Sequence, residues 1–128
     1  VLRYAAAHDV GRAINPMVVL NQIYGAVIQG LGIALYEELL IDKEKHNYLN
    51  PDFLDYKIPT MLDVPEITPI MIESNEPLGP FGAKGIGEHA ILPVPAAIAN
   101  AVYNAVGVRI REMPISPERV LKALKNKG

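Results

Sequence analysis

The chain has 128 residues and a mass of 14.0 kDa, which is room for one domain with a single hydrophobic core. Half of the residues are hydrophobic and a fifth are charged, a composition that excludes an intrinsically disordered chain. The formal net charge of −2 gives no basic surface of the kind that binds nucleic acid or an acidic membrane. The absence of cysteine excludes a disulfide scaffold, a thiolate zinc site and iron–sulfur ligands on this chain, and it is compatible with a cytoplasmic location.

The first predicted element is a buried strand over Val1–Ala7, which is apolar apart from Arg3. Because the sequence starts inside an element, without a cap or a tail, we expect it to be part of a longer polypeptide. Turn signals follow at Asp9–Arg12 and at Asn15-Pro16. From Pro16 onward, apolar residues recur every three or four positions and predict a helix of about six turns: Val19, Ile23, Val27, Ile28, Leu31, Leu35 and Leu39.

This predicted helix contains Gly25, Gly30 and Gly32, and each glycine costs about 1 kcal/mol relative to alanine in a helix interior. A helix that tolerates all three is expected to have another helix or a ligand packed closely against its backbone. We expect no apolar run of the roughly 20 residues needed to cross a bilayer, and we therefore predict no membrane partner.

The rest of the chain alternates short strands with turns and then ends in helices. The charged turn over residues 42–47 has apolar flanks and predicts a hairpin. Short strands are predicted at three places, Asp55–Ile58, Ile67–Glu73 and Val108–Glu112. A long glycine-rich loop over Ser74–Gly87 precedes a helical stretch over Ala90–Val106, and a last helix starts at Ser116-Pro117-Glu118. The fold class is therefore α+β, one domain with a long N-terminal glycine-containing helix, short mixed strands and C-terminal helices.

The stretch Gly79–Glu88 (GPFGAKGIGE) carries the most chemical information. Its glycines let the backbone approach a ligand without side-chain obstruction, and successive N–H groups there are suited to an anion or a developing oxyanion. Glu88, at the end of the loop, is suited to act as a general base if it points into a pocket. The alternative, slightly favoured on physical grounds alone, is that the glycines only build a turn and that Glu88 complements the dipole of the next helix.

Two phosphate-binding motifs are relevant to the same loop. A P-loop requires Ser or Thr directly after Gly-Lys, whereas Lys84 is followed by Gly85. The stretch Gly85–Ala90 has the spacing of a dinucleotide fingerprint, but such a motif needs a strand that runs straight into its first glycine, and Pro77–Gly82 cannot form one. We interpret this match as accidental and keep a nucleotide-binding module as a weaker alternative.

Two amides, Gln22 and Gln29, are two turns apart on the predicted long helix. Both therefore fall on one face with helix glycines, and amides on such a face are suited to bind the heteroatoms of a planar cofactor. Solvent-exposed positions, or glycines that pack another helix, explain the pattern equally well. The histidines have no pairing at i, i+4, so we predict no metal site on this chain alone: His8, His46 and His89.

Five segments of the sequence, in order, resemble successive signatures of one known family. They are residues 9–16 (DVGRAINP), 21–32 (NQIYGAVIQGLG), 55–60 (DYKIPT), 82–88 (GAKGIGE) and 95–101 (PAAIANA). The ending Met113–Glu118 is similar as well. The resemblance covers essentially the whole chain, and the family is the xanthine dehydrogenase / aldehyde oxidase family of molybdenum hydroxylases, at the C-terminal part of its molybdopterin-binding subunit.

This resemblance implies a molybdenum–molybdopterin cofactor, in prokaryotic members usually in the cytosine dinucleotide form. It also implies 2Fe-2S clusters and FAD on partner domains or subunits. Within the chain it makes Glu88 the catalytic base beside molybdenum and places backbone groups of Gly85, Ile86 and Gly87 against the cofactor. Gln22 matches a glutamine near the pterin or its phosphates. The resemblance makes no residue of this chain a metal ligand.

We therefore predict that residues 1–128 are the C-terminal part of a molybdopterin-cofactor-binding domain, either as a fragment or as a split subunit. The predicted activity is oxidative hydroxylation of an aldehyde or N-heterocycle in a larger cytoplasmic complex, and the isolated chain is expected to be inactive. Its expected partners are the remainder of the molybdopterin-binding subunit, iron–sulfur and FAD subunits and a small-molecule substrate, in an oligomer. The alternative is a noncatalytic α+β packing or assembly domain in which the glycine loop is only structural.

Overall fold

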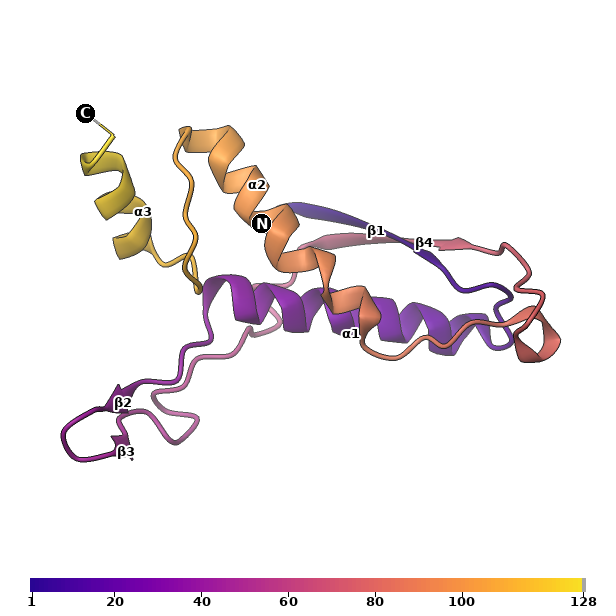
Figure 1. Cartoon of the computed structure of the whole chain (residues 1–128), viewed down its shortest axis with the longest axis horizontal. Coiled ribbons are helices and arrows are strands. Elements are labelled where there is room, and N and C mark those ends of the chain that lie inside the picture. The colour runs from indigo at the N-terminus through magenta and orange to yellow at the C-terminus, as the bar shows by residue number, and fades with distance from the viewer. Residues whose placement is uncertain (128) are drawn as a thin grey trace.

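The computed structural model describes residues 1–127 and contains both helices and strands, arranged around one long helix (Figure 1). That helix, α1 (Pro16–Leu35), begins where Asn15 caps it: the Asn15 side-chain oxygen accepts a hydrogen bond from the Val18 N–H at 3.2 Å. It ends where the N–H groups of Tyr36 and Glu37 both donate to the Gly32 carbonyl at 2.9 Å. The predicted long helix is confirmed, although it stops before Leu39.

One face of α1 forms the centre of the hydrophobic core. Ile23 and Val27 on this face are completely buried, and Leu31 is nearly so. Buried residues from β1, α2 and the segment before α3 complete the core: Ala6, Val10, Val94, Ile98 and Ile115. The core is thus built by segments from both ends of the sequence that pack on one helix, which is why distant loops come together beside it.

The prediction that no segment is long and apolar enough to cross a membrane is wrong. Among the described residues, α1 alone meets that criterion of length and composition. The reason is that Pro16–Leu35 contains no charged residue at all, and amides are its most polar side chains. In this fold 44% of its most apolar window is buried inside the protein, as in the core helix of a globular domain.

Strand β1 (Arg3–Asp9) pairs in parallel with β4 (Glu66–Ile72), in a register that sets Ala6 opposite Pro69. Both strands lie against α1. The strand predicted at the N-terminus exists, but it begins later than expected and is not buried: Ala6 is its only buried residue. The reason is that only one face of this two-stranded ladder is covered by α1 in the described residues.

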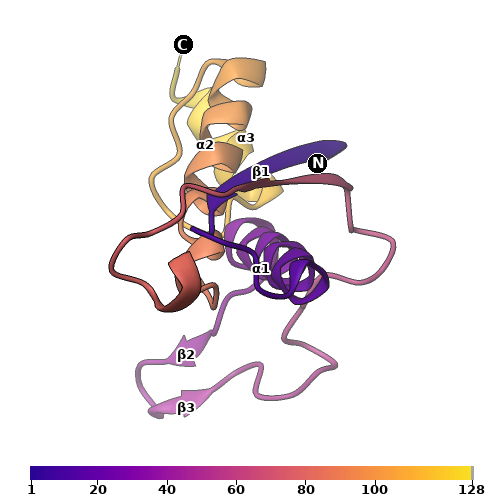
Figure 2. The same cartoon turned by 90° about the vertical axis from the view of Figure 1, so that its right-hand side faces the viewer.

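The predicted hairpin is confirmed as β2 (Ile41–Asp42) and β3 (Asn47–Tyr48), which pair antiparallel. It projects away from α1 on the side opposite α2 (Figure 2). The buried Asn50 side chain fixes its base, because Asn50 accepts from the Leu40 N–H at 2.8 Å and donates to the Glu38 carbonyl at 2.7 Å.

The strand predicted at Asp55–Ile58 is wrong, since a turn ends at Asp55 and the residues after it form no regular structure. The Asp52 carboxylate accepts from the N–H groups of Leu54 and Asp55, at 3.0 and 3.3 Å, and this local bonding competes with strand formation. The strand predicted at Val108–Glu112 is also wrong. Although Val108 is buried, no neighbouring strand pairs with this segment within residues 1–127.

Helix α2 (Pro93–Val106) crosses α1 where Gly30 lacks a side chain: a Cβ there would lie 2.5 Å from the Cβ of Val94. One glycine of α1 therefore does allow close packing of another helix, as predicted. Pro93 and Pro95 lie in the first turn of α2, where the N–H groups of a helix have no intrahelical partners. Short 3₁₀ turns precede it, η1 (Pro80–Gly82) and η2 (His89–Ile91).

Helix α3 (Pro117–Lys125) is confirmed together with its predicted cap, since the Ser116 hydroxyl accepts from the Arg119 N–H at 3.3 Å. The helix has no buried residue of its own. Arg119 ties it to the segment after α1, with a guanidinium nitrogen 2.6 Å from the Glu38 carboxylate. The α+β class and the single core predicted from the sequence are both observed.

Candidate functional site

The glycine loop that carries the predicted site residues is anchored to the end of β1 by Asp9. The Asp9 carboxylate accepts hydrogen bonds from the Gly11 N–H and the Ser74 hydroxyl, both at 2.9 Å, and from the Lys84 ammonium at 2.6 Å. These donors come from the turn after β1 and from the two ends of the loop that follows β4. One carboxylate thus joins the turn after β1 to both ends of a loop that is 65 to 75 residues away in the sequence.

Asp9 and Lys84 each shift the pKa of the other. The Lys84 ammonium, then the Gly11 N–H and the Ser74 hydroxyl, hold the pKa of Asp9 well below its usual range. The hydrogen bond to Asp9 in turn raises the pKa of Lys84, and the carboxylate of Glu76 lies 3.9 Å from the same ammonium. Neither Asp9 nor Lys84 was predicted to have a role in the site. The available signal was the aspartate two residues before a glycine, a spacing typical of an Asx turn.

Gly11 allows the loop to approach the turn closely. Its φ of +67° is in the left-handed region, and a side chain there would overlap the carbonyl oxygen of Gly82. Backbone hydrogen bonds fix the contact, from the Lys84 N–H to the Val10 carbonyl at 2.9 Å and from the Asn75 N–H to the Gly11 carbonyl at 2.8 Å. Backbone hydrogen bonds therefore fix both ends of the loop against the turn after β1.

Beyond Lys84 the loop is open. In the part of the chain that the structure describes, the N–H groups of Gly85, Ile86 and Gly87 donate to no protein acceptor. A Cβ at Gly85 or Gly87 would meet nothing within 4 Å, whereas Ile86 is half-buried and packs against the core. The predicted cofactor-binding backbone is thus a run of free donors, held in place by the Ile86 side chain between two uncovered glycines.

Glu88 follows directly and is exposed. It precedes η2, and its carbonyl accepts from the Ile91 N–H at 3.0 Å. Its carboxylate makes no capping hydrogen bond and has no ion-pair partner among residues 1–127. Because α2 begins only at Pro93, Glu88 is not an acid in the first turn of α2, which was the alternative role.

His89 places this segment beside β1. Its ring meets that of His8 edge-on, with 5.5 Å between the centroids, and η2 packs against α1 through the fully buried Ala90. Burial, followed by the nearby His89, lowers the pKa of His8. Within the described residues, no group of three or more His, Asp or Glu side chains is arranged to hold a metal ion.

The amides predicted on α1 lie on an open face of the helix. Gln22, Gly25 and Gln29 are all exposed, and a Cβ at Gly25 would meet nothing within 4 Å. The glycines of this helix thus have different roles: Gly30 accommodates Val94 and Gly32 lies against Pro59 and Glu37, so neither is left open as Gly25 is. The donors and acceptors of Gln22 and Gln29 remain available to a ligand.

The cavities formed by this chain alone do not enclose these residues. Neither Glu88 nor Gln22 lines any of four depressions found within residues 1–127. One of them, of about 210 Å³, lies between the start of α1 and the loop and includes Lys84 and Ile86 in its lining. Glu88 and Gln22 thus share none of these four depressions, and their contact with one ligand is a proposal that concerns the complete protein.

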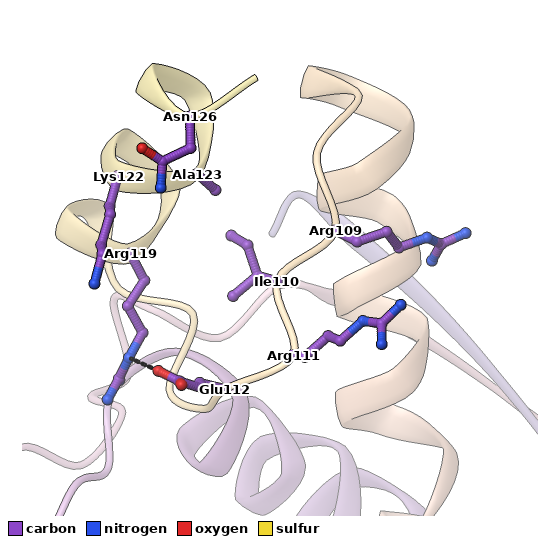
Figure 3. A pocket seen from close by; sticks show the side chains of 8 residues that line it. All are labelled: Arg109, Ile110, Arg111, Glu112, Arg119, Lys122, Ala123 and Asn126. Atoms are coloured by element: carbon purple, nitrogen blue, oxygen red, sulfur yellow. Dashed lines mark ion pairs between the residues drawn. The ribbon is translucent and has the colours of Figure 1, made fainter. Parts of the chain in front are cut away.

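A second depression, of about 300 Å³, lies between α3 and the segment before it and has several basic residues in its lining. Figure 3 shows that these cations diverge, since Arg109 and Arg111 extend toward α2 whereas Arg119 and Lys122 lie along α3. The Arg109 guanidinium stacks on Tyr103 at 3.9 Å from the ring centroid. The basic side chains therefore do not form one anion site.

The weaker alternative, a nucleotide-binding module, required a strand feeding directly into Gly85. The structure has the 3₁₀ turn η1 (Pro80–Gly82) before this loop, and β4 ends much earlier, at Ile72. The free donor groups and exposed amides instead suit a ligand rich in oxygen and nitrogen atoms, such as a pterin with phosphate groups. The residues present therefore fit a molybdopterin-type cofactor.

Comparison with known proteins agrees with this fit. Residues 1–65 match the family described as "Molybdopterin cofactor-binding domain". The chain is 43% identical over 118 residues to a xanthine dehydrogenase molybdenum-binding subunit of Escherichia coli, which covers 92% of this chain and 16% of the relative. It is 40% identical over 125 residues to the aldehyde oxidoreductase molybdenum-binding subunit PaoC of Escherichia coli, covering 97% of this chain and 17% of the relative. The chain thus spans about a sixth of the length of these relatives.

Solved structures show the same similarity in three dimensions. Quinoline 2-oxidoreductase from Pseudomonas putida superposes with a TM-score of 0.89 at 38% identity, covering 97% of this chain and 16% of that one. Aldehyde oxidoreductase from Desulfovibrio gigas superposes with a TM-score of 0.82 at 36% identity, covering 94% of this chain and 13% of that one. The chain therefore belongs to the molybdopterin cofactor-binding domain family, in the xanthine dehydrogenase and aldehyde oxidase group of molybdenum enzymes.

Proposed function

We propose that this chain forms part of the cofactor-binding wall of a molybdenum hydroxylase that oxidatively hydroxylates an aldehyde or an N-heterocycle. The enzyme acts in the cytoplasm, its cofactor is the cytosine dinucleotide form of molybdopterin, and electrons leave through 2Fe-2S clusters and FAD on partner subunits. The observation that carries the proposal is the run of N–H groups at Gly85–Gly87, which ends at the carboxylate of Glu88, all without a partner among residues 1–127. Its support comes from the names of the relatives, which include xanthine dehydrogenase and aldehyde oxidoreductase subunits.

The N–H groups of Gly85, Ile86 and Gly87 would hold the cofactor. When bound, the molybdenum–pterin group supplies a two-electron redox centre. The three donors bind its oxygen atoms without rearrangement, because Lys84 fixes the preceding backbone and the Ile86 side chain packs in the core. The glycines on either side keep the approach open, since a Cβ at either would meet nothing within 4 Å in this chain.

Glu88 is the proposed general base. A base must be within hydrogen-bond reach of the proton that it accepts, and the Glu88 carboxylate forms neither a cap nor an ion pair within residues 1–127 that would occupy its oxygens. A neighbouring cationic metal centre would keep the carboxylate ionised while leaving it able to accept a proton in the transition state. Glu88 would therefore take the proton of the attacking oxygen nucleophile.

The exposed amide face of α1 gives the cofactor a second contact. Gln22 has a carbonyl oxygen and an amide NH₂ free, and Gly25 on the same face leaves room for a flat ring system. Gln29 lies two helical turns farther along that face. The packing of η2 on α1 brings the segment after Glu88 to this helix, and a ligand that spans the loop and the amide face would contact both.

The partner part of the proposal is supported by large apolar side chains that have no cover in this chain. Phe53 and Met61 are each 86% exposed and Leu62 is 98% exposed, on a segment that follows the hairpin. Exposed apolar patches of this kind mark interfaces. We expect the 128-residue chain by itself to self-associate in sedimentation experiments, and a monodisperse monomer would count against this docking surface.

The experiment that tests the function is Glu88→Gln in the intact subunit, purified with its partner subunits. We expect turnover to fall by about 100-fold or more, because general-base catalysis contributes at least that much, while molybdenum content stays nearly unchanged. The matched control is Glu44→Gln, an exposed glutamate in the hairpin turn with the same change in charge. Turnover close to the unmodified enzyme in Glu88→Gln would instead favour a noncatalytic packing or assembly domain.

A further inference from the structure

The ladder of β1 and β4 leaves one edge of β1 without partners. Hydrogen bonds from the Glu66 N–H to the Leu2 carbonyl and from the Val10 N–H to the Ile72 carbonyl fix which residues face across it. In a parallel strand the N–H and C=O groups of alternate residues point to opposite edges. The backbone groups of the even-numbered residues of β1 and β4 therefore face each other. The N–H and C=O groups of Arg3, Ala5 and Ala7 therefore point to the other side, where they have no partner among residues 1–127.

The two outer edges of this ladder are not equivalent. Pro69 is odd-numbered and stands at the middle of β4, so its ring nitrogen faces the outer edge of that strand. Proline has no N–H, and its presence on an edge prevents another strand from pairing there. The outer edge of β1 has no proline and offers an uninterrupted set of donors and acceptors. The sequence thus blocks one edge and leaves the other open.

A wide, mostly apolar groove lies along the open edge. It has a volume of about 1060 Å³ and is bounded by residues 1–5 on one side and by α2 on the other. No residue of β4 lines it, so the groove is on the side of β1 that faces away from β4. Figures 1 and 2 show the start of β1 beside α2. The α2 residues that line it are mostly small or apolar: Ala97, Ile98, Ala101, Val102, Asn104 and Ala105.

We propose that a strand from the part of the molybdenum-binding subunit outside residues 1–128 pairs with the outer edge of β1 and fills this groove. Its backbone bonds to Arg3, Ala5 and Ala7, and its side chains cover the exposed Leu2 and the alanines of α2. The inference rests on the proposed function in one respect, which is that this chain is part of a larger subunit.

Two observations favour this occupant over a transient partner. The relatives are about six times as long as the matched region, since that region is 16% of their length, so most of the subunit lies outside this chain. The groove lining contains one charged residue, Arg3, and apolar surfaces of this kind are typical of permanent interfaces. A two-stranded sheet is also marginal by itself, so an added strand would stabilise the ladder.

Residue-resolved hydrogen exchange in the intact subunit tests the pairing. The N–H groups of Ala5 and Ala7 are expected to exchange about 100-fold or more slowly than an unprotected amide, as slowly as that of Ala6, which faces β4. Exchange of Ala5 and Ala7 at unprotected rates, with Ala6 protected, would overturn the proposal. Protection that depends on protein concentration would also overturn it, because the occupant would then be a second copy of this chain.

A matched pair of variants tests the groove. Ala101→Phe places a ring in the groove, whereas Ala96→Phe places the same ring on an exposed position of α2 outside its lining. We expect Ala101→Phe to abolish the slow exchange of Ala5 while Ala6 stays protected, and Ala96→Phe to leave both unchanged. An unchanged Ala5 in Ala101→Phe would contradict the proposal. Neither readout uses turnover, so an inactive Glu88→Gln enzyme with protected Ala5 separates this inference from the catalytic one.

Discussion

Residues 82–84 and residues 85–88 are neighbours in one loop, but their surroundings differ. The first segment is bonded to the turn after β1, through the Lys84 N–H at 2.9 Å from the Val10 carbonyl and the Lys84 ammonium at 2.6 Å from Asp9. The second has free N–H groups and a carboxylate without a partner in the described residues. The comparison indicates that the first segment positions the loop and the second is left available for a ligand, as expected when a binding site is held by rigid neighbours.

The largest effect is expected from glycine substitutions that separate the two segments. Gly11→Ala should destabilise the protein by about 3 kcal/mol, because it combines a left-handed φ of +67° with overlap of the Gly82 carbonyl. Gly85→Ala should change the free energy of unfolding by less than about 1 kcal/mol, since its Cβ would lie in open space, and should lower molybdenum content. Denaturant unfolding and metal analysis of the intact subunit measure both. Equal losses of stability would show that the two segments do not differ.

A smaller effect is expected on the amide face. Gln22→Ala should reduce cofactor affinity by about tenfold, which corresponds to one lost hydrogen bond to a polar ligand. Asn21→Ala is the control, because Asn21 is also an exposed amide of α1 but lies about 100° around the helix from Gln22. Titration of the cofactor-free subunit, followed by metal analysis, gives the two affinities. A similar loss in both variants would mean that Gln22 has no specific contact.

The smallest effect concerns the Asp9 anchor and its dependence on pH. The pKa of Asp9 is lowered in the fold, so its contribution to stability is present above the ordinary carboxyl pKa of about 4 and is lost as the pH falls toward the lower folded value. Lys84→Met removes the largest cause of that shift and should flatten the loss of stability below about pH 4, while Lys45→Met in the hairpin should not. Thermal unfolding between pH 3 and pH 7 measures this pH dependence. Identical pH profiles for Lys84→Met and the unmodified protein would show that the pair of Asp9 and Lys84 does not contribute to stability.

The elements that could be predicted from the sequence are those whose signals are local. The periodicity after Pro16, the cap at Ser116 and the turn between β2 and β3 each depend on neighbours in the sequence, and all three are observed. The strand predicted at Asp55–Ile58 failed because the Asp52 side chain bonds the following backbone. Strand patterns alone do not show whether a partner is present.

Candidate residues for the site could be chosen from the sequence, but the contacts that position them could not. Composition and spacing indicated the glycines before Glu88, and the family resemblance gave them a role. The ion pair of Asp9 with Lys84 joins residues 75 positions apart, which no local pattern indicates. The different roles of the helix glycines could not be predicted either, because only the crossing of α2 distinguishes Gly30 from Gly25.

The attachment of α3 determines where the molecule opens first. With no buried residue of its own, α3 is held by the partly buried Val120 and by Arg119, whose guanidinium binds Glu38 and donates to the Pro114 carbonyl at 2.7 Å. Ion pairs of this kind weaken as salt rises, whereas apolar burial along α1 does not. The C-terminal helix should therefore detach by local opening before the core unfolds, and a protease added at high ionic strength should cut in the segment just before α3 while residues 1–106 stay intact.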